Sequence, residues 1–190
     1  MLIYHIKIEN FRGIKSSNFI LGEPVNCLIG AGDSTKSTIL DAIEYVLSPN
    51  WFIPFDDSDF SNCDISHEIK IDVTLGPVPE DLISETKYGL HLRGWKRDTK
   101  QINDEPEDND IKVLTIRLKV DQSLTPEWFV INERIPDGVH IPFRDRQRLG
   151  VSRIGIDIDN ELAWVRGASL LRLKQDKNDA EKIILESIDY

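Results

Sequence analysis

A polyphosphate chain can be bound by the residue types found between Gly30 and Ser37. In order, these residues are Gly30, Ala31, Gly32, Asp33, Ser34, Thr35, Lys36 and Ser37. Glycine lets the backbone approach a ligand closely. The N–H groups that open a helix converge on phosphate oxygens and add the favourable helix dipole. The segment therefore predicts a nucleoside triphosphate site.

The side chains that follow the glycines have separate predicted roles. Lys36 would reach the β- and γ-phosphates as a point charge, and the hydroxyl of Ser37 would be a ligand of Mg²⁺ beside phosphate oxygens and waters. Thr38 would open the helix proper and add a backbone donor near the α-phosphate. A nucleoside triphosphate and Mg²⁺ are thus the predicted ligands.

One position departs from the usual phosphate-loop pattern G-x-x-x-x-G-K-[ST]. Thr35 stands where that pattern has its second glycine. A β-branched residue there restricts the backbone and crowds the phosphates, although Gly32 and the turn formers Asp33 and Ser34 compensate in part. The alternative is a turn without a ligand in front of an amphipathic helix. The Lys36-Ser37 pair and the elements on both sides favour phosphate binding.

Those elements are a strand before the loop and a helix after it. The run from Val25 to Ile29 is almost wholly apolar, which predicts a central strand buried on both faces, with Cys27 in the core. Apolar residues then recur at helical spacing until Ser48-Pro49 ends the pattern. The helical positions are Ile39, Ala42, Ile43, Val46 and Leu47.

Further strands are predicted along the rest of the chain from alternating or apolar runs. Residues 68–75 should form a half-exposed strand, with a short helix at 79–84 after it. The acidic run Asp104 to Asp108 is interpreted as a solvated or disordered hairpin tip. The other expected strands are 2–8, 19–21, 113–120 and 128–131, and 51–64 is expected to be an ordered loop.

Bulk composition narrows the classes of function. The chain has 190 residues, a formal net charge of −10 and a pI near 4.9, so its surface as a whole repels a nucleic-acid backbone. Its two cysteines, Cys27 and Cys63, stand apart and predict neither a disulfide nor a metal site. No apolar run approaches the roughly 20 residues that cross a bilayer. We predict a cytoplasmic protein that does not contact a membrane.

The first 60 residues resemble a known group of ATPases. The order of features is a first strand, Asn10-Phe11-Arg12, a second strand, a third strand and the phosphate loop. This order resembles the heads of the SMC/RecF/OLD group of ABC-type ATPases, most of all those of OLD-family and RecF-like members. The resemblance implies that the nucleotide is ATP. The resemblance implies an α/β P-loop NTPase fold of ABC-ATPase type. It also implies an N-terminal lobe with a mixed or antiparallel sheet around the P-loop helix.

The same resemblance implies a division of the chain and a nucleotide contact. Residues 1–60 would be the core of the lobe, 61–167 mainly strands with an acidic loop at 96–111, and 168–190 helices that continue into a longer protein. Phe11 would lie in the core. Arg12 would contact phosphate or adenosine, with a surface arginine at a strand end as the alternative that stays open.

For the complete protein, the resemblance implies an enzyme and its partners. It would be a head-to-head homodimer that hydrolyses ATP to process DNA in repair or phage defence, in one version as an endonuclease. This acidic segment alone is not expected to bind DNA. The late motifs of such heads are not convincing here. Ile154 to Asp159 is a weak Walker B match, and Arg166 to Leu170 does not form a clear signature motif. We therefore expect the N-terminal part of an ATPase, weak in binding and slow or inactive in hydrolysis by itself.

Two other functions stay open from the sequence. The chain could be a regulatory or protein-binding module with a degenerate loop, which captures a partner through Trp51 to Phe60. It could instead be a small-molecule kinase, which needs basic lid residues over the phosphates. The candidate lid residues are Arg144, Arg146, Arg148 and Arg153.

Overall fold

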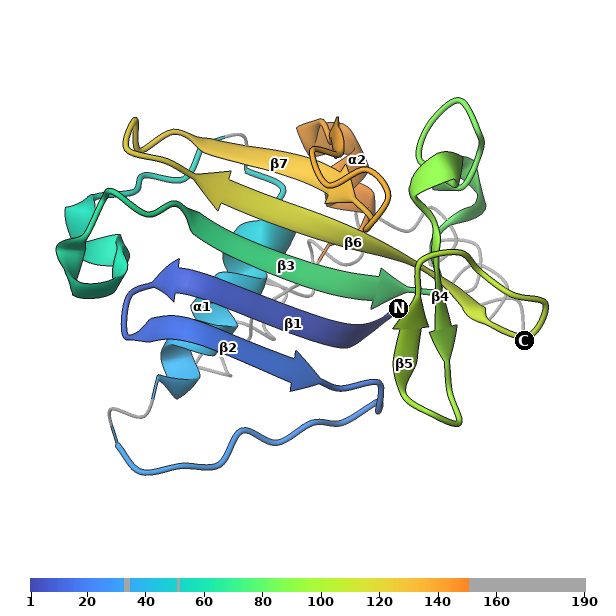
Figure 1. Ribbon diagram of the computed structural model, residues 1–190, viewed down its shortest axis with the longest axis horizontal. Coiled ribbons are helices and arrows are strands. Elements are labelled where there is room, and N and C mark those ends of the chain that lie inside the picture. The colour runs from blue at the N-terminus through green and yellow to red at the C-terminus, as the bar shows by residue number, and fades with distance from the viewer. Residues whose placement is uncertain (33–34, 51, 151–190) are drawn as a thin grey trace, which may run out of the picture. The chain divides into compact units, whose positions relative to one another are not determined.

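The fold is built on one antiparallel sheet with a helix against it (Figure 1). The structure is a computed structural model, in which residues 1–32, 35–50 and 52–150 are described. The strands are β1 (Leu2–Phe11), β2 (Ile14–Ile20), β3 (Ile69–Gly76), β4 (Arg93–Lys96), β5 (Gln101–Asn103), β6 (Ile111–Val120), β7 (Pro126–Ile131) and β8 (Val139–His140). The helices are α1 (Lys36–Leu47) and α2 (Phe143–Arg148), with the 3-10 turns η1 (Asp57–Asp59), η2 (Ser61–Cys63), η3 (Glu80–Leu82) and η4 (Gly89–His91).

The strands follow the order β2-β1-β3-β6-β4-β5, with β7 also paired to β6 and β8 paired to β7. Every pairing among the described strands is antiparallel. β3 lies between β1 and β6, and only Lys70 of its residues is partly exposed. The prediction of a half-exposed strand at 68–75 is therefore wrong in burial, because neighbours on both sides and a covered face enclose it.

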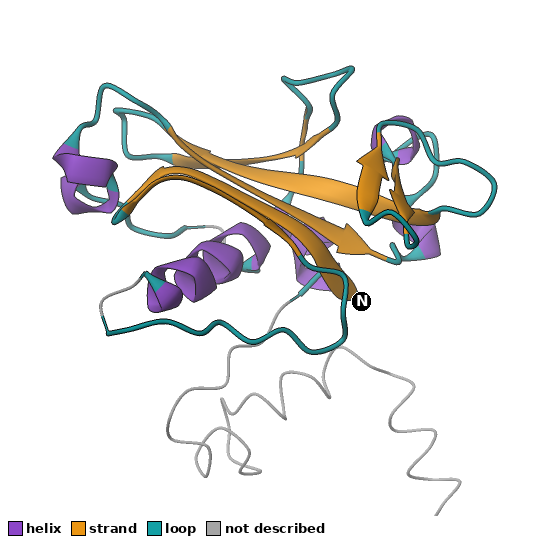
Figure 2. Ribbon diagram, turned by 60° about the horizontal axis from the view of Figure 1, so that its bottom comes forward, coloured by secondary structure: helices purple, strands orange, loops and turns teal. Residues whose placement is uncertain are grey.

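The hydrophobic core lies between the sheet and α1 (Figure 2). Alternation along the central strands sends one set of side chains toward the helix. The helix returns the residues that its 3.6-residue period places on one face. The buried strand residues include Ile6, Ile8, Ile71, Val73, Ile116 and Leu118, and the buried helix residues are Ile39, Ala42, Val46 and Leu47. The predicted helix and its buried face are confirmed, with the helix beginning at Lys36 and not at Thr38.

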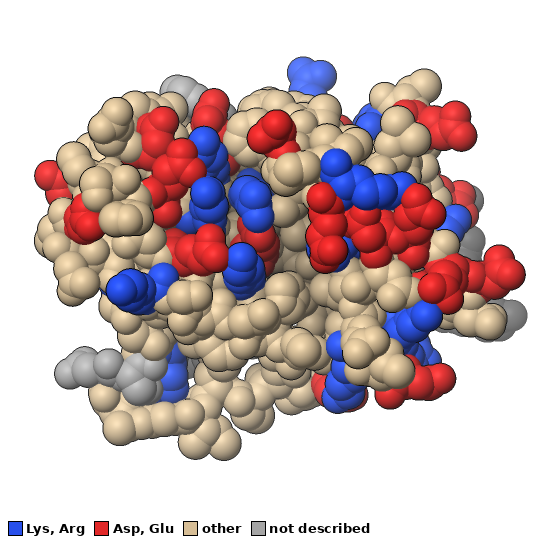
Figure 3. Space-filling view, viewed as in Figure 1, with Lys and Arg blue, Asp and Glu red and all other residues tan. Residues whose placement is uncertain are grey.

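The opposite face of the sheet is covered by intermingled charges (Figure 3). Asp72 of β3 accepts two hydrogen bonds from Arg117 of β6, both at 2.7 Å. Lys7 pairs with Glu9 at 2.7 Å on β1. Because opposite charges face each other across neighbouring strands, the sheet tolerates a polar face without repulsion.

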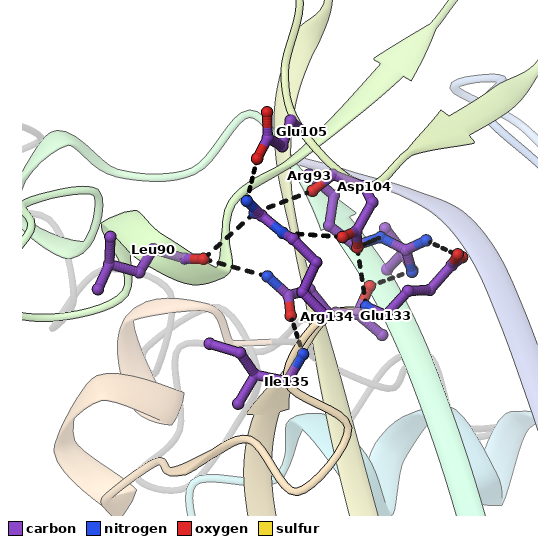
Figure 4. Close-up of polar contacts among 10 residues, drawn as sticks. Leu90, Arg93, Asp104, Glu105, Glu133, Arg134 and Ile135 are labelled. Atoms are coloured by element: carbon purple, nitrogen blue, oxygen red, sulfur yellow. Dashed lines mark hydrogen bonds and ion pairs between the residues drawn. The ribbon is translucent and has the colours of Figure 1, made fainter.

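The acidic run after β5 is solvated at Glu105, Glu107 and Asp108, which are exposed, but Asp104 is held by the protein. Asp104 accepts from the backbone N–H of Glu133 at 2.8 Å and pairs with Arg134 at 2.8 Å (Figure 4). Asp110 accepts from the side chain of Asn103 at 3.1 Å. The predicted solvation is therefore confirmed for the exposed carboxylates, and the contact of Asp104 was not predicted because its cationic partner, Arg134, comes from a segment far along the chain.

The apolar run before the phosphate loop is also not a buried strand. The side chains of Val25 and Ile29 are 78% and 93% exposed, and Cys27 is exposed. After β2, Leu21 still donates to Tyr4 of β1 at 2.8 Å, but Gly22 then adopts a φ of 100° against the ring of Trp95 and the chain leaves the sheet. A central strand needs hydrogen-bonded neighbours, and no described strand pairs with residues 25–29.

Candidate functional site

The predicted phosphate contacts are brought together where the loop enters α1. Gly30, Ala31, Gly32 and Ser37 are exposed, whereas Thr35, Lys36 and Thr38 are partly buried. Asp33 and Ser34 lie outside the described residues. The first four N–H groups of a helix have no carbonyl partner within the helix, so the first turn of α1 offers backbone donors to an anion at this point.

The ammonium group of Lys36 folds back over the start of the loop. Its Nζ atom donates to the carbonyl oxygen of Gly30 at 2.9 Å and also to that of Ala31. These partners are neutral, and a phosphate oxygen is a stronger acceptor for a charged donor. The arrangement therefore places a positive charge beside the backbone donors of the helix, as polyphosphate binding requires.

Ser37 lies in the first turn of α1 with its side chain exposed. A hydroxyl is a neutral oxygen donor of the kind that Mg²⁺ accepts when phosphates and waters complete its octahedron. Among the described residues, no group of three or more His, Cys, Asp or Glu side chains forms a metal site. The donor set thus fits a magnesium ion that is bound mainly through a nucleotide.

Thr35 carries the backbone strain that its position implies. Its φ and ψ are 62° and 11°, in the left-handed region that glycine usually fills. For a non-glycine residue this conformation costs about 1–2 kcal/mol. Thr35 therefore holds a left-handed conformation that a glycine at this position would adopt without strain.

Arg12 lies between the β1–β2 turn and α1 with 31% of its side chain exposed. Its Nε donates to Asp59 at 2.8 Å, its Nη1 to Asp41 at 2.5 Å, and its Nη2 to the hydroxyl of Tyr45 at 3.1 Å. Burial alone would lower the pKa of Arg12, but the hydrogen bonds and nearby charges of Asp59, Tyr45 and Asp41 raise it. A nucleotide contact by Arg12 stays a prediction.

The residues that hold Arg12 were not predicted from the sequence. Asp59 closes a small turn in which Asp56 accepts from Ser58 N at 2.8 Å and Asp59 accepts from Asp56 N at 3.1 Å. The acidic spacing Asp56 to Asp59 is a local signal for such a capping box. It does not reveal that Arg12 N donates to the carbonyl of Asp59 at 2.7 Å from far along the chain.

A second arginine, Arg146, holds the C-terminal end of α1. Arg146 is only 3% exposed, and its Nη1 and Nη2 donate to the carbonyls of Ser48 at 2.9 Å and Asn50 at 3.1 Å. Its guanidinium lies 3.7 Å from the ring centroid of Trp128. This position excludes Arg146 from a mobile lid over phosphates.

The remaining lid candidates give no closed basic surface. Arg148 pairs with Asp81, Arg144 is exposed on α2, and Arg153 lies outside the described residues. The residues up to 150 that the structure describes therefore give no support to a kinase lid.

A separate hollow of about 350 Å³ lies on the charged face of the sheet. His5, Lys7, Arg93 and Arg117 are among its cationic or titratable lining residues. Lys7 pairs with Glu9, Arg93 with Glu133 and Arg117 with Asp72. Because these charges are already compensated by carboxylates, the loop before α1 remains the better candidate for a phosphate ligand.

Comparison with known proteins identifies the family. A family model described as the AAA ATPase domain matches residues 1–163. The chain belongs to the AAA ATPase domain family. The sequence prediction of a P-loop NTPase fold is thereby confirmed, and the antiparallel sheet around the P-loop helix agrees with it. Membership of this family also supports nucleotide binding by the AAA ATPase domain described here.

Two further comparisons accompany the family match. A solved structure from work described as "Structural biochemistry of ATP-driven dimerization and DNA stimulated activation of SMC ATPases" is 13% identical, with a TM-score of 0.46. The match covers 97% of each chain. A search of curated proteins found no match. The family assignment therefore rests on the sequence model.

The helices of this AAA ATPase domain were also compared with the length and hydropathy that a membrane span requires. Within the described residues, no helix meets both requirements.

Proposed function

We propose that this AAA ATPase domain binds Mg-ATP on the loop from Gly30 to Ser37. One observation carries the proposal: the Lys36 ammonium lies over the carbonyls of Gly30 and Ala31, at the N-terminal end of α1. A positive charge and the N–H groups of the first helical turn at one point form a binding site for polyphosphate. The family match supports ATP as the nucleotide.

Each part of the loop has a role in this proposal. Backbone donors from Gly30 to Thr38, with Asp33 and Ser34 among them, orient the phosphates, and Lys36 neutralises their β and γ charge. Ser37 contributes a hydroxyl to Mg²⁺. Arg12 reaches a phosphate or the adenosine if it exchanges one of its present partners for the nucleotide.

We further propose a role for the complete protein. It is a cytoplasmic ATPase of the SMC/RecF/OLD type, and this chain is its N-terminal lobe. The protein hydrolyses ATP as a head-to-head homodimer. Hydrolysis serves to process DNA in repair or phage defence, in one version by an endonuclease activity. The net charge of −10 argues that DNA meets other parts of that protein. Resemblance of residues 2–60 to such heads supports the proposal.

Removal of the lysine ammonium tests the nucleotide site. We expect Lys36→Ala to abolish measurable Mg-ATP binding in isothermal titration calorimetry, because the neutral side chain leaves the β- and γ-phosphates without their counter-charge. Lys112→Ala is the matched control, since Lys112 is an exposed lysine on β6 and the net charge changes equally. Equal ATP affinity in the wild type and the Lys36 variant would contradict the assignment.

The strained Thr35 favours one second candidate, a regulatory module that binds nucleotide without turnover. A residue that crowds the γ-phosphate can preserve binding and still disturb the geometry of hydrolysis. The proposed partner-binding stretch supports this candidate less well, because Ile53, Phe55 and Phe60 are buried and only Phe52 is strongly exposed among its described large apolar residues. Phosphate release by the complete protein separates the two, since the regulatory module predicts binding with no turnover.

A further inference from the structure

The turn between β1 and β2 touches the phosphate loop. An ideal Cβ atom built on Gly13 would lie 3.0 Å from the Cγ2 methyl carbon of Thr35. That separation is well inside the usual contact distance of about 3.5–4.0 Å between carbon atoms. Gly13 therefore leaves room for a methyl group that a glycine in place of Thr35 would not possess.

Arg12 links the β1–β2 turn to α1. Arg12, which precedes Gly13, donates its backbone N–H to Asp59 at 2.7 Å and its guanidinium to Asp41 of α1. The turn and the helix therefore cannot move apart without breaking an ion pair. A side chain added to Gly13 would press on Thr35 and on the strained backbone at that residue.

We propose that Gly13 is a positioning residue for the phosphate loop: it accommodates the Thr35 methyl group and so permits Thr35 to take the left-handed conformation normally assigned to glycine. This inference rests on the proposed function where it concerns ATP. It explains how the family pattern is satisfied by Thr35. The phosphate-loop pattern has a glycine at the position of Thr35. Here the space for the Thr35 methyl group is provided by Gly13, which lies 22 positions earlier in the chain.

A double-mutant cycle on the full 190-residue chain tests the contact. We expect Gly13→Ala to weaken Mg-ATP affinity about tenfold, since a forced shift of Thr35 misplaces the neighbouring N–H donors and Lys36. Thr35→Ser removes only the methyl group and should stay within about twofold of the wild type. The combined variant should return to within about threefold of the wild type, because the added Cβ then has no other described atom within 4 Å.

Rescue distinguishes positioning from a general loss of fold. Each variant is first checked by its melting temperature without nucleotide, and affinities are compared only between folded proteins. If Gly13→Ala binds ATP as the wild type does, or if Thr35→Ser fails to rescue it, the proposed coupling is wrong. Thr35→Gly provides a second rescue that also removes the backbone strain.

A measurement without nucleotide separates this inference from the proposed function. Amide hydrogen exchange at the start of α1 should be faster in Gly13→Ala and return toward the wild-type rate in the combined variant. If the wild type binds no ATP, the proposed function fails, while the exchange rates still decide whether Gly13 positions the loop. Exchange rates that are the same in all variants would overturn the coupling even if ATP binds.

Discussion

Two arginines hold α1, one against the body of the helix and one at its C-terminal end, and their charges are stabilised in different ways. We call Arg12 with Asp41, Tyr45 and Asp59 the Arg12 cluster, and Arg146 with Ser48, Asn50 and Trp128 the Arg146 cluster. The Arg12 cluster includes two carboxylates. In the Arg146 cluster, the guanidinium contacts carbonyl oxygens and an aromatic ring.

The helix dipole accounts for this difference. A helix C-terminus carries partial negative charge, so the carbonyls that follow α1 can receive a cation without a carboxylate. Arg12 contacts Asp41 and Tyr45, which lie beyond the first turn of α1, so its charge is compensated by the carboxylates of Asp41 and Asp59 and not by the dipole. The comparison teaches that an arginine packed against the body of α1 needs carboxylate partners, whereas one at the C-terminal end is stabilised by carbonyl dipoles and an aromatic ring.

Protonation follows the same contrast. Burial lowers the pKa of Arg146 to about 10, whereas the pKa of Arg12 is raised despite its own burial by Asp59, Tyr45 and Asp41. Both side chains are therefore charged at neutral pH. The charge on Arg146 is stabilised by dipoles and by the face of Trp128, and this interaction depends on close packing.

Arg146→Ala should give the largest loss of stability in this comparison. It removes the cation from the face of Trp128 and leaves the carbonyls of Ser48 and Asn50 without their donor, so we expect about 3 kcal/mol less free energy of unfolding. Urea unfolding followed by tryptophan fluorescence measures it. Arg144→Ala is the control on the same helix, where the side chain is exposed. A loss below about 1 kcal/mol would mean that the burial cost of the cation cancels its contacts.

Arg12→Gln should have a smaller effect that depends on salt. Glutamine keeps a similar backbone preference but leaves two partly buried carboxylates without a cation, which we expect to cost about 1–2 kcal/mol. In 1 M NaCl, where the screening length is about 3 Å, the difference from the wild type should shrink. The Arg146→Ala difference should change little, because its partners carry no net charge. Arg97→Ala is an exposed control, and equal salt sensitivity at both sites would refute the contrast.

The local part of this architecture could be predicted from the sequence. Alternation gave the positions of β1, β3, β6 and β7, and the apolar spacing gave α1 with its buried face, because these patterns depend on neighbours within one element. The phosphate-binding role of Gly30 to Ser37 was predicted from an equally local pattern and stays a prediction. Their identity is local and their spacing is fixed.

What could not be predicted depends on contacts between distant segments. The run from Val25 to Ile29 has the composition of a buried strand, but Gly22 turns it away from the sheet and no described strand pairs with it. Arg12 and Asp59 are 47 positions apart, and Arg146 and Ser48 are 98 apart. Gly13 carried no signal, since its importance lies in the methyl group of Thr35 that it accommodates.

The smallest predicted effect is a change in stability with pH, in a range where neither Arg12 nor Arg146 changes its charge. His91 is 8% exposed, and both of its ring nitrogens are buried without a hydrogen-bond partner among the described residues. Burial, aided by the nearby charge of Arg134, lowers the pKa of His91, and burial likewise lowers that of His5. The unfolded chain therefore binds protons more readily than the folded one just below the ordinary histidine pKa of about 6.5.

Stability should consequently fall as the pH decreases from 7 to 5.5, and the fall should be shallower in His91→Leu. The slope does not vanish, because His5 contributes with the same sign. Urea unfolding of both proteins at several pH values measures the two slopes. Parallel slopes would show that His91 gains a proton partner or solvent access on protonation. A slope that also changed in Arg12→Gln would mean that a group in the Arg12 cluster contributes to the pH dependence of stability in this range.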